Sequence, residues 1–258
     1  VTMRLLSRLK DVPLLVFSRS IYGRVIAKHD SFQIVAAETR HLDHIVKFLG
    51  EYHYRQVPTI SCFPNVDYVR MAERLSDDTY NQIKEGLSFF VEEEMSGEMV
   101  GVGLFYTLRI SLKDHFSSLA DKFKLCNSFY HWKLVEALYN NLDIREEYGS
   151  HRIIRARLYS LKPRFQKLGL GNTFLTPSNL VQLPGYQDVA EDKSLFSGEA
   201  NGETANKIMG LCGYEDVKRI NYRDFEIDGK HPFRNLAETT GNTHITVRVA
   251  PMNPGDSN

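Results

Sequence analysis

The alternation of hydrophobic and polar positions near the start of the chain predicts a strand followed by a helix. Residues 32–37 read FQIVAA, which alternates and is rich in β-formers, so this run predicts a strand. Apolar residues then recur at helical spacing from Leu42 to Leu49. Thr39 is the expected N-cap of this helix, and Pro58 marks its expected end.

The middle of the chain predicts a hairpin that is flanked by helices. Residues 69–87 predict a helix with a break at Ser76, a second N-cap candidate. A long stretch of about residues 114–141 also favours helix. The strands predicted in this part are residues 87–94 and 99–110, joined by the turn MSGE, and residues 151–161.

The last third of the chain predicts further alternation of strand and helix. Pro177 weakens the prediction of a helix after Gly171, because proline disrupts a helix interior. Residues 202–214 predict a short amphipathic helix with Gly213 as its C-cap. Strands are predicted within residues 185–197, 217–225 and 243–250. The whole order predicts an α/β (α+β) domain with helices packed on a sheet.

Composition restricts the class of partner and the compartment. The chain has 258 residues, 42% hydrophobic and 25% charged, with a formal net charge of zero, so neither a basic nucleic-acid-binding surface nor an acidic tail is predicted. No apolar run is long enough to span a bilayer, so no membrane partner is predicted. Three scattered cysteines without a Cys-x-x-Cys motif favour a reducing compartment, here the cytoplasm.

Residues 1–30 differ from the rest in charge. They hold six basic residues against only Asp11 and Asp30, a composition typical of an organelle transit peptide. The alternatives are an ordinary basic extension and a poorly ordered leader. We therefore expect an extension at residues 1–30, one domain at residues 31–250 and a polar tail at residues 251–258, with a mitochondrial location as the alternative to the cytoplasm.

The motif RFQKLGLG, residues 164–171, lies between a predicted strand and a predicted helix. Glycine at Gly169 and Gly171 allows a ligand to approach the backbone closely. The first N–H groups of a helix lack intrahelical partners and attract anions. Basic residues lie beside the turn: Lys162, Arg164 and Lys167. The motif therefore predicts a phosphate-binding turn, and the alternative is a tight turn with no ligand.

Two common phosphate motifs do not fit this turn. A P-loop requires Lys and Ser or Thr after its last glycine, and Asn172 follows Gly171 here. A dinucleotide-binding fingerprint requires glycine or alanine at residue 174, which is Phe174. The turn needs another explanation.

The turn and the order of elements resemble the GNAT superfamily of N-acetyltransferases. LKPRFQKLGLG resembles that family's pyrophosphate-binding run, and ETANKIMGLCGY resembles its short late helix. Closer similarity, to the invertebrate aralkylamine (dopamine-type) N-acetyltransferases, covers about residues 31–250: FLGEYHYRQVP, GEANGETANKIMGLCGYEDVKRINYRDF, DGKHPF and THITVRV.

This resemblance implies a fold and a cosubstrate. The expected fold is a central mixed, mostly antiparallel sheet flanked by helices and splayed between its fourth and fifth strands. The expected cosubstrate is acetyl-CoA, with no metal. Tyr159 and Leu161 are expected to offer strand backbone to its pantetheine arm. The residues expected to hold its pyrophosphate are Gln166, Lys167, Leu168, Gly169, Leu170 and Gly171.

The catalytic positions of the family are not filled by the usual residues. The glutamate that precedes the helix-end proline in the invertebrate enzymes is Val57 here. The two strand histidines of vertebrate members are Arg155 and Arg157. The late-helix serine and tyrosine positions are Ala205 and Met209.

Four other residues are candidates for acid–base work. Glu51, His53 and Tyr159 are the predicted catalytic residues, and Glu199 is a further candidate. Each has a simpler interpretation: a solvated or packed side chain for Glu51 and His53, and a main-chain role for Tyr159. The function predicted is transfer of acetyl from acetyl-CoA to a small primary amine, an arylalkylamine, by direct attack on the thioester.

Two alternatives remain open: a catalytically impaired acyl-CoA-binding protein with the same fold, and a phosphate-binding domain unrelated to acetyl transfer. The sequence makes no prediction of oligomeric state.

Further patterns are explained without a ligand. His41 and His44 are three residues apart, which suits a metal, but with no third ligand in the sequence a solvated helix face is favoured. The run Glu92 to Glu94 is expected at a hairpin end, although Glu93 or Glu94 would be able to face an amine. Aromatic residues within NSFYHW and EALY are expected in the core rather than in a substrate pocket.

Overall fold

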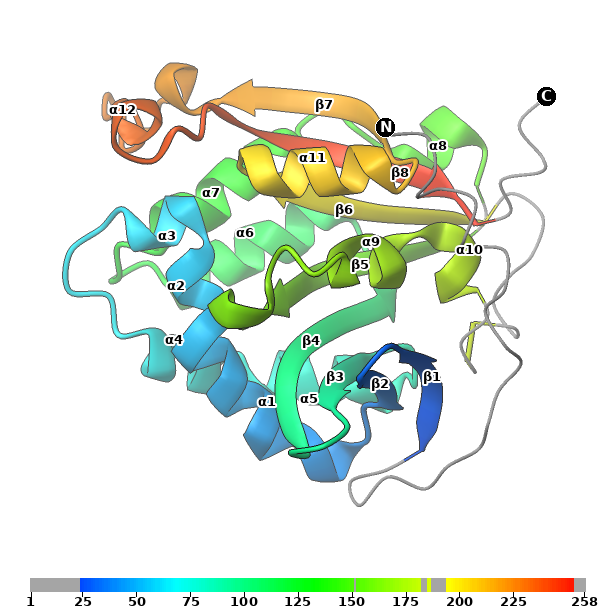
Figure 1. The fold of residues 1–258 in the computed structure, drawn as a ribbon. Coiled ribbons are helices and arrows are strands. Elements are labelled where there is room, and N and C mark those ends of the chain that lie inside the picture. The colour runs from blue at the N-terminus through cyan, green and yellow to red at the C-terminus, as the bar shows by residue number, and fades with distance from the viewer. Residues whose placement is uncertain (1–23, 151, 182–184, 187–193, 253–258) are drawn as a thin grey trace, which may run out of the picture.

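The computed structural model describes residues 24–150, 152–181, 185–186 and 194–252, and in them one eight-stranded sheet forms the centre of the fold (Figure 1). The strand order is β1-β2-β3-β4-β5-β6-β8-β7. Neighbouring strands run antiparallel except β5 and β6, which run parallel. The predicted mixed, mostly antiparallel sheet flanked by helices is confirmed. The strands are β1 Val25–His29, β2 Phe32–Ala36, β3 Phe89–Glu93, β4 Glu98–Thr107, β5 Ile153–Leu161, β6 Leu195–Asn201, β7 Glu215–Asn221 and β8 His244–Pro251.

Helices cover both faces of the sheet, and buried side chains from most of its strands divide between two apolar clusters. Figure 1 shows α9 and α11 in front of the sheet and α6 and α7 behind it. The helices are α1 Leu42–Phe48, α2 Tyr54–Gln56, α3 Pro58–Ser61, α4 Tyr68–Arg74, α5 Ser76–Lys84, α6 Leu112–Lys122, α7 Phe129–Leu138, α8 Ile144–Tyr148, α9 Leu170–Leu175, α10 Pro177–Leu180, α11 Glu203–Leu211 and α12 Leu236–Thr240.

Strand β5 carries one bulge, and its parallel pairing with β6 is short. Its parallel register with β6 runs from the pair Ile153–Leu195 to the pair Ala156–Gly198. Its antiparallel register with β4 shifts at Arg157, which is an extra residue in the ladder. Bulges generally bend a strand and increase its local twist. The splay of the two strands stays a prediction, and the short parallel register supports it.

Helix α1 continues into a π-helical segment, Leu49–His53, before α2. Such wider turns in a helix frequently accompany functional sites. Gly50 lies in this segment, and a Cβ there would come within 2.9 Å of the Val69 Cα, so α4 packs directly on it. Val57 then leaves the helical conformation, and Pro58 is the first residue of α3. The interruption predicted at Pro58 is therefore confirmed as a junction between two helices.

Some boundaries differ from the predicted ones. The sheet begins at Val25, because residues 25–29 pair with β2, whereas the domain was expected to begin at residue 31. Residues 1–23 lie outside the described residues. The helix expected over residues 114–141 is two helices, α6 and α7, which pack against each other with Phe116 and Trp132 stacked. Helix α8 was not predicted.

The ends of the late elements also move. Strand β7 ends at Asn221, where the prediction continued to residue 225, because Tyr222–Asp224 form a 3-10 turn. Pro251, expected in the tail, is the last residue of β8, and residues 253–258 lie outside the described residues. Gly213 follows α11 with a φ of 87°, which confirms its place after the helix end.

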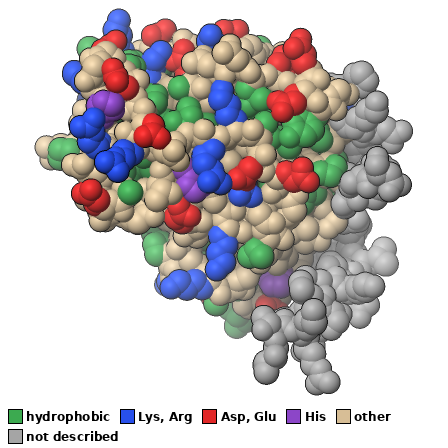
Figure 2. All heavy atoms as spheres, turned by 90° about the horizontal axis from the view of Figure 1, so that it is seen from above, with side chains coloured by type: hydrophobic (Ala, Val, Ile, Leu, Met, Phe, Trp, Pro, Cys, Tyr) green, Lys and Arg blue, Asp and Glu red, His purple; other side chains and the backbone are tan. Residues whose placement is uncertain are grey.

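The surface carries mixed charge. Figure 2 shows Lys and Arg side chains interspersed with Asp and Glu on the face seen from above. Among the residues that the structure describes, no helix combines the length and apolar character that crossing a membrane requires.

Candidate functional site

The motif RFQKLGLG lies between strand β5 and helix α9, as its position in the sequence predicted. Lys167 and Gly169 both adopt left-handed conformations, with φ of 68° and 81°. Gly169 is the N-cap of α9, and a Cβ placed on it would meet no atom within 4 Å. Glycine therefore suits this position because of its left-handed backbone, and the space beside it is open to a ligand. Helix α9 is short, because Thr176 is extended and Pro177 begins α10.

The second glycine has a packing role. Gly171 is buried, and a Cβ there would lie 3.5 Å from Ile208 and 3.9 Å from Tyr159. Helix α9 thus rests closely on α11 at this point. The motif combines one glycine for the turn and one for the contact between two helices.

Two side-chain amides converge on the last residue of β5. Nε2 of Gln56 and Nε2 of Gln166 donate to the Leu161 carbonyl oxygen, at 3.2 and 3.3 Å. Gln166 also donates to Oε1 of Gln56, which ties the turn to the end of α2. A carbonyl oxygen has two lone pairs, so both are occupied. A ligand would have to displace one amide or bind another backbone group.

The positive charge beside the turn is partly neutralised within the protein. Nζ of Lys162 lies 2.6 Å from Glu98, and Arg164 pairs with the other oxygen of the same carboxylate. The hydrogen bond from Lys162, with the charge of both cations, lowers the pKa of Glu98 despite the opposing effect of burial. An incoming phosphate would compete with Glu98 for these two cations.

Tyr159 lies on the face of the sheet that α9 and α11 cover. Its ring packs against Phe89 and Phe174, and its buried hydroxyl has no hydrogen-bond partner among the described residues. Burial, with a smaller effect of Cys212, raises the pKa of Tyr159 well above its ordinary value. The hydroxyl is therefore protonated at neutral pH and able to donate a hydrogen bond.

Glu51 and His53 lie on the π-helical segment and differ in surroundings. Glu51 is exposed and faces Lys47, with Nζ at 3.8 Å. His53 is partly buried, and burial together with the charges of Arg157 and His131 lowers its pKa to about 3. An imidazole with so low a pKa is a poor proton acceptor at neutral pH.

The two strand arginines are held by different partners. Arg155 is buried and pairs with Glu199, and its Nη1 donates to the Tyr139 hydroxyl at 2.9 Å. Its guanidinium also lies 5.0 Å from the Phe116 ring centroid. Burial alone would lower the pKa of Arg155, but the charge of Glu199 raises it well above its ordinary value. Glu199 is thus engaged in an internal ion pair.

Within the described ranges, Arg157 binds only neutral groups. Its Nη1 donates to Oγ1 of Thr79 at 3.0 Å and to Oε1 of Gln82 at 2.8 Å. Its Nη2 donates to the Tyr54 hydroxyl at 3.1 Å. These partners come from α5 and α2, so Arg157 connects β5 to the helices on that face of the sheet.

A buried hydrogen-bond chain near α3 had no signal in the sequence. The Tyr222 hydroxyl donates to Asn201, whose amide donates to Thr59, and the Thr59 hydroxyl lies 2.7 Å from Nδ1 of His131. Burial lowers the pKa of His131 to about 3, so the ring is neutral. The four residues come from four separate elements, and only the folded chain brings them together.

The remaining sequence candidates have structural roles. His41, expected on a solvated face, is buried, because its ring packs against Phe90 and its Nδ1 accepts from the Glu38 amide. Glu93 and Glu94 bind Ser96 and Lys28 at the hairpin end. Among the described residues no group of three potential metal ligands occurs. Trp132 and Tyr139 belong to the core, as expected.

Met209 and Ala205, the two late-helix positions named from the sequence, both carry apolar side chains. Met209 is buried on α11 and lies close to Gly198, where a Cβ would come within 3.5 Å of the Met209 Cε. Ala205, on the same helix, packs against the same apolar cluster. This side of β6 is therefore apolar.

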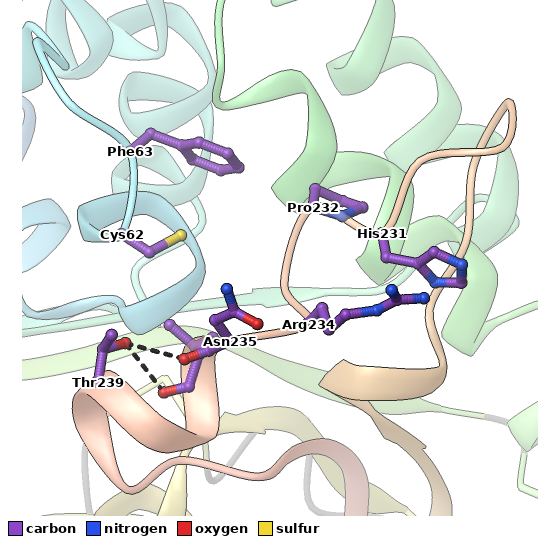
Figure 3. A pocket seen from close by; sticks show the side chains of 8 residues that line it. Cys62, Phe63, His231, Pro232, Arg234, Asn235 and Thr239 are labelled. Atoms are coloured by element: carbon purple, nitrogen blue, oxygen red, sulfur yellow. Dashed lines mark hydrogen bonds between the residues drawn. The ribbon is translucent and has the colours of Figure 1, made fainter.

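A surface pocket of about 420 Å³ lies between the end of α3 and the loop before α12 (Figure 3). Cys62 and Phe63 form one wall, and the segment from His231 to Asn235 forms the opposite one. Partial desolvation raises the pKa of the Cys62 thiol to about 11, so it is not a ready nucleophile. The residues predicted for the cofactor and for catalysis do not line this pocket.

Comparison of sequences gives no relative: no family model and no curated protein matches the chain. Comparison of structures, in contrast, finds solved proteins with a similar fold. The polyamine N-acetyltransferase of Drosophila melanogaster, an enzyme that forms N-acetylagmatine, superposes with a TM-score of 0.68 over 85% of this chain and 99% of its own, at 13% identity. The chain has the GNAT acetyltransferase fold. Two mosquito structures agree with this assignment.

Arylalkylamine N-acetyltransferase 2 from Aedes aegypti matches the GNAT fold of this chain with a TM-score of 0.67, 15% identity and coverage of 86% here and 99% there. Mosquito arylalkylamine N-acetyltransferase like 5b superposes with a TM-score of 0.68 at 16% identity, over 85% of this chain and 99% of its own. The predicted GNAT resemblance is confirmed in structure. Identities this low establish the fold and leave the activity to be argued from the site.

Proposed function

We propose that this protein transfers an acetyl group from acetyl-CoA to the primary amine of a small molecule. The observation that carries the proposal is the Gln-x-x-Gly-x-Gly turn at the end of β5, where Lys167 and Gly169 are left-handed and the space beside Gly169 is open. This turn follows β5, one strand of the parallel pair β5–β6. Solved structures with a similar fold include a polyamine and an arylalkylamine N-acetyltransferase.

In this proposal the cosubstrate follows β5. The amides of residues 166–171 and the Lys167 side chain bind the pyrophosphate, and the pantetheine arm enters where the β5–β6 register ends, after Ala156. Backbone groups of Tyr159 and Leu161 line its path. Three free cysteines among the described residues favour a reducing compartment, which we propose to be the cytoplasm.

The chemistry proposed needs an uncharged amine. The amine nitrogen attacks the thioester carbonyl carbon, the C–S bond breaks, the thiolate takes up a proton and the new amide nitrogen loses one. The ammonium of the acceptor loses its proton to water before the nitrogen attacks, so the reaction proposed here does not depend on a strong base. Tyr159, with its protonated hydroxyl, is the proposed donor to the thiolate.

A second candidate is an acyl-CoA-binding protein without turnover. It is favoured by the state of the acid–base groups: Glu199 is paired with Arg155, Glu51 faces solvent and His53 has a pKa near 3. The two candidates share the cosubstrate and differ only in release of CoA.

Calorimetry with acetyl-CoA, followed by thiol release with a panel of amines, tests both. Gly169→Ala should weaken acetyl-CoA binding about tenfold, because the methyl group enters the open space of the turn and strains a left-handed residue. Gly149→Ala is the matched control, since Gly149 is also left-handed in open space but ends α8, in another part of the chain.

Binding with thiol release supports the transferase. Binding without release from any amine supports the second candidate. Equal loss of binding in both glycine variants, or no binding by the wild-type protein, contradicts the assignment of the turn.

A further inference from the structure

The position of Arg157 bears on which amine the protein accepts. It is the bulged residue of β5 and directly follows Ala156, the last residue paired with β6. Under the proposed function, on which this inference rests, the reacting thioester lies at that point. An acceptor whose amine reaches the thioester therefore passes close to the Arg157 guanidinium.

Hydrogen bonds hold the Arg157 guanidinium in place but occupy only part of its N–H donors. Thr79, Gln82 and Tyr54 accept three of its hydrogen bonds from two sides. A guanidinium has five N–H donors, so the Nε hydrogen and the second Nη2 hydrogen remain. Neither has a hydrogen bond within the described part of the chain, and the residue is only partly buried. Two donors remain for a ligand.

The charge of Arg157 is not balanced by its neighbours. In the described residues no carboxylate pairs with it: Glu199 pairs with Arg155, and Asp78 pairs with Lys122 at 2.8 Å. Three nearby histidines do not alter this balance at neutral pH, because burial, with arginine charge at the first two, keeps their imidazoles uncharged: His53, His115 and His131. The region around Arg157 thus has a net positive charge.

This charge discriminates between classes of amine. An acceptor with a second cationic group, such as agmatine, would be repelled by Arg157. A carboxylate on the acceptor would accept the two remaining donors and neutralise the charge. We propose that the acceptor is an amine that also carries a carboxylate, an amino acid, with Arg157 as the residue that binds this carboxylate.

Matched pairs of amines test the proposal, each pair differing only in the carboxylate: tyrosine with tyramine, and arginine with agmatine. The expected result is at least about tenfold higher kcat/KM for the amino acid of a pair, the factor that a charge-assisted hydrogen bond supplies. Arg157→Gln should remove that preference mainly by raising KM for the amino acid. Acetyl-CoA affinity should not change.

Two variants complete the design. Arg70→Gln removes one exposed arginine on α4 and should leave the preference intact. Arg157→Lys keeps the charge without the planar fork and should retain part of the preference. If Arg157→Gln does not fold, the wild-type comparison and Arg157→Lys still decide the matter.

The outcomes separate this inference from the function on which it rests. Acetyl-CoA binding with turnover of tyramine or agmatine in preference to the amino acids keeps the transferase and overturns the inference. A preference for amino acids that survives in Arg157→Gln overturns the role of Arg157. Absence of acetyl-CoA binding overturns the proposed function, and absence of turnover with intact binding overturns the inference and leaves the non-catalytic protein.

Discussion

Replacing Glu199 by glutamine leaves the Arg155 guanidinium buried without its counter-charge. The exposed fractions of the two side chains are 9% for Glu199 and 2% for Arg155. Breaking a buried ion pair by removing one partner costs about 3–5 kcal/mol, because the remaining charge has lost its water and gained no replacement. Glutamine keeps one oxygen acceptor, so we expect the lower end, about 3 kcal/mol of the free energy of unfolding.

Urea and thermal unfolding measure this loss directly. For a chain of this size, about 3 kcal/mol corresponds to a fall in Tm of about 6–12 °C. Glu94→Gln is the matched control, since it removes the same charge from the exposed pair with Lys28, whose side chains are 43% and 38% exposed. An exposed pair contributes at most about 1 kcal/mol.

The double variant Arg155→Met with Glu199→Met distinguishes the ion pair from simple packing. Because both charges are removed together, most of the loss should be recovered. The reasoning is refuted if Glu199→Gln costs no more than Glu94→Gln, or if the double variant is as unstable as Glu199→Gln alone.

Three further changes have definite expected outcomes. The His131 pKa is about 3 in the fold against an ordinary 6.5, so the unfolded chain binds the extra proton and stability falls as pH drops below 6.5. Its share is about 2 kcal/mol at pH 5, so His131→Asn should make the fall in the free energy of unfolding between pH 7 and pH 5 less steep by about that amount; an unchanged urea-unfolding profile contradicts this. Thr59→Val should lower the free energy of unfolding in urea by about 1–3 kcal/mol, because His131 and Asn201 lose a buried hydrogen-bond partner. A loss no larger than that of an exposed substitution would count against the buried hydrogen-bond chain. Gly101→Ala should cost about 1–3 kcal/mol by calorimetry, since its Cβ would lie 2.5 Å from Leu161 Cδ2, and an unchanged Tm would show that Leu161 moves freely.

The order of elements could be read from the sequence because it depends on local patterns. The alternation in residues 32–37 gave β2, and the two runs around MSGE gave the β3–β4 hairpin. Boundaries were less accurate where tertiary pairing decides them. Strand β1 was missed because residues 25–29 become a strand by pairing with β2, and the basic excess over residues 1–30 indicated an extension instead.

The conformation of the turn after β5 also depends on local sequence. Glycine at 169 permits a left-handed residue, and the structure has one there. The partner of Gly171 was not readable, because Ile208 lies on α11, far away in sequence. Likewise Gln56 and Gln166 meet on the Leu161 carbonyl from two elements that no sequence pattern relates.

What the sequence determined by itself is the set of chemical groups available and the local conformations: a glycine-dependent turn after a strand, arginine at 155 and 157, and valine before Pro58. Only the tertiary structure decided the state of those groups. It pairs Glu199 with Arg155, leaves Arg157 with neutral partners and buries His131. Charge, proton affinity and accessibility depend on neighbours in space, and neighbours in space come from elements that are distant along the chain.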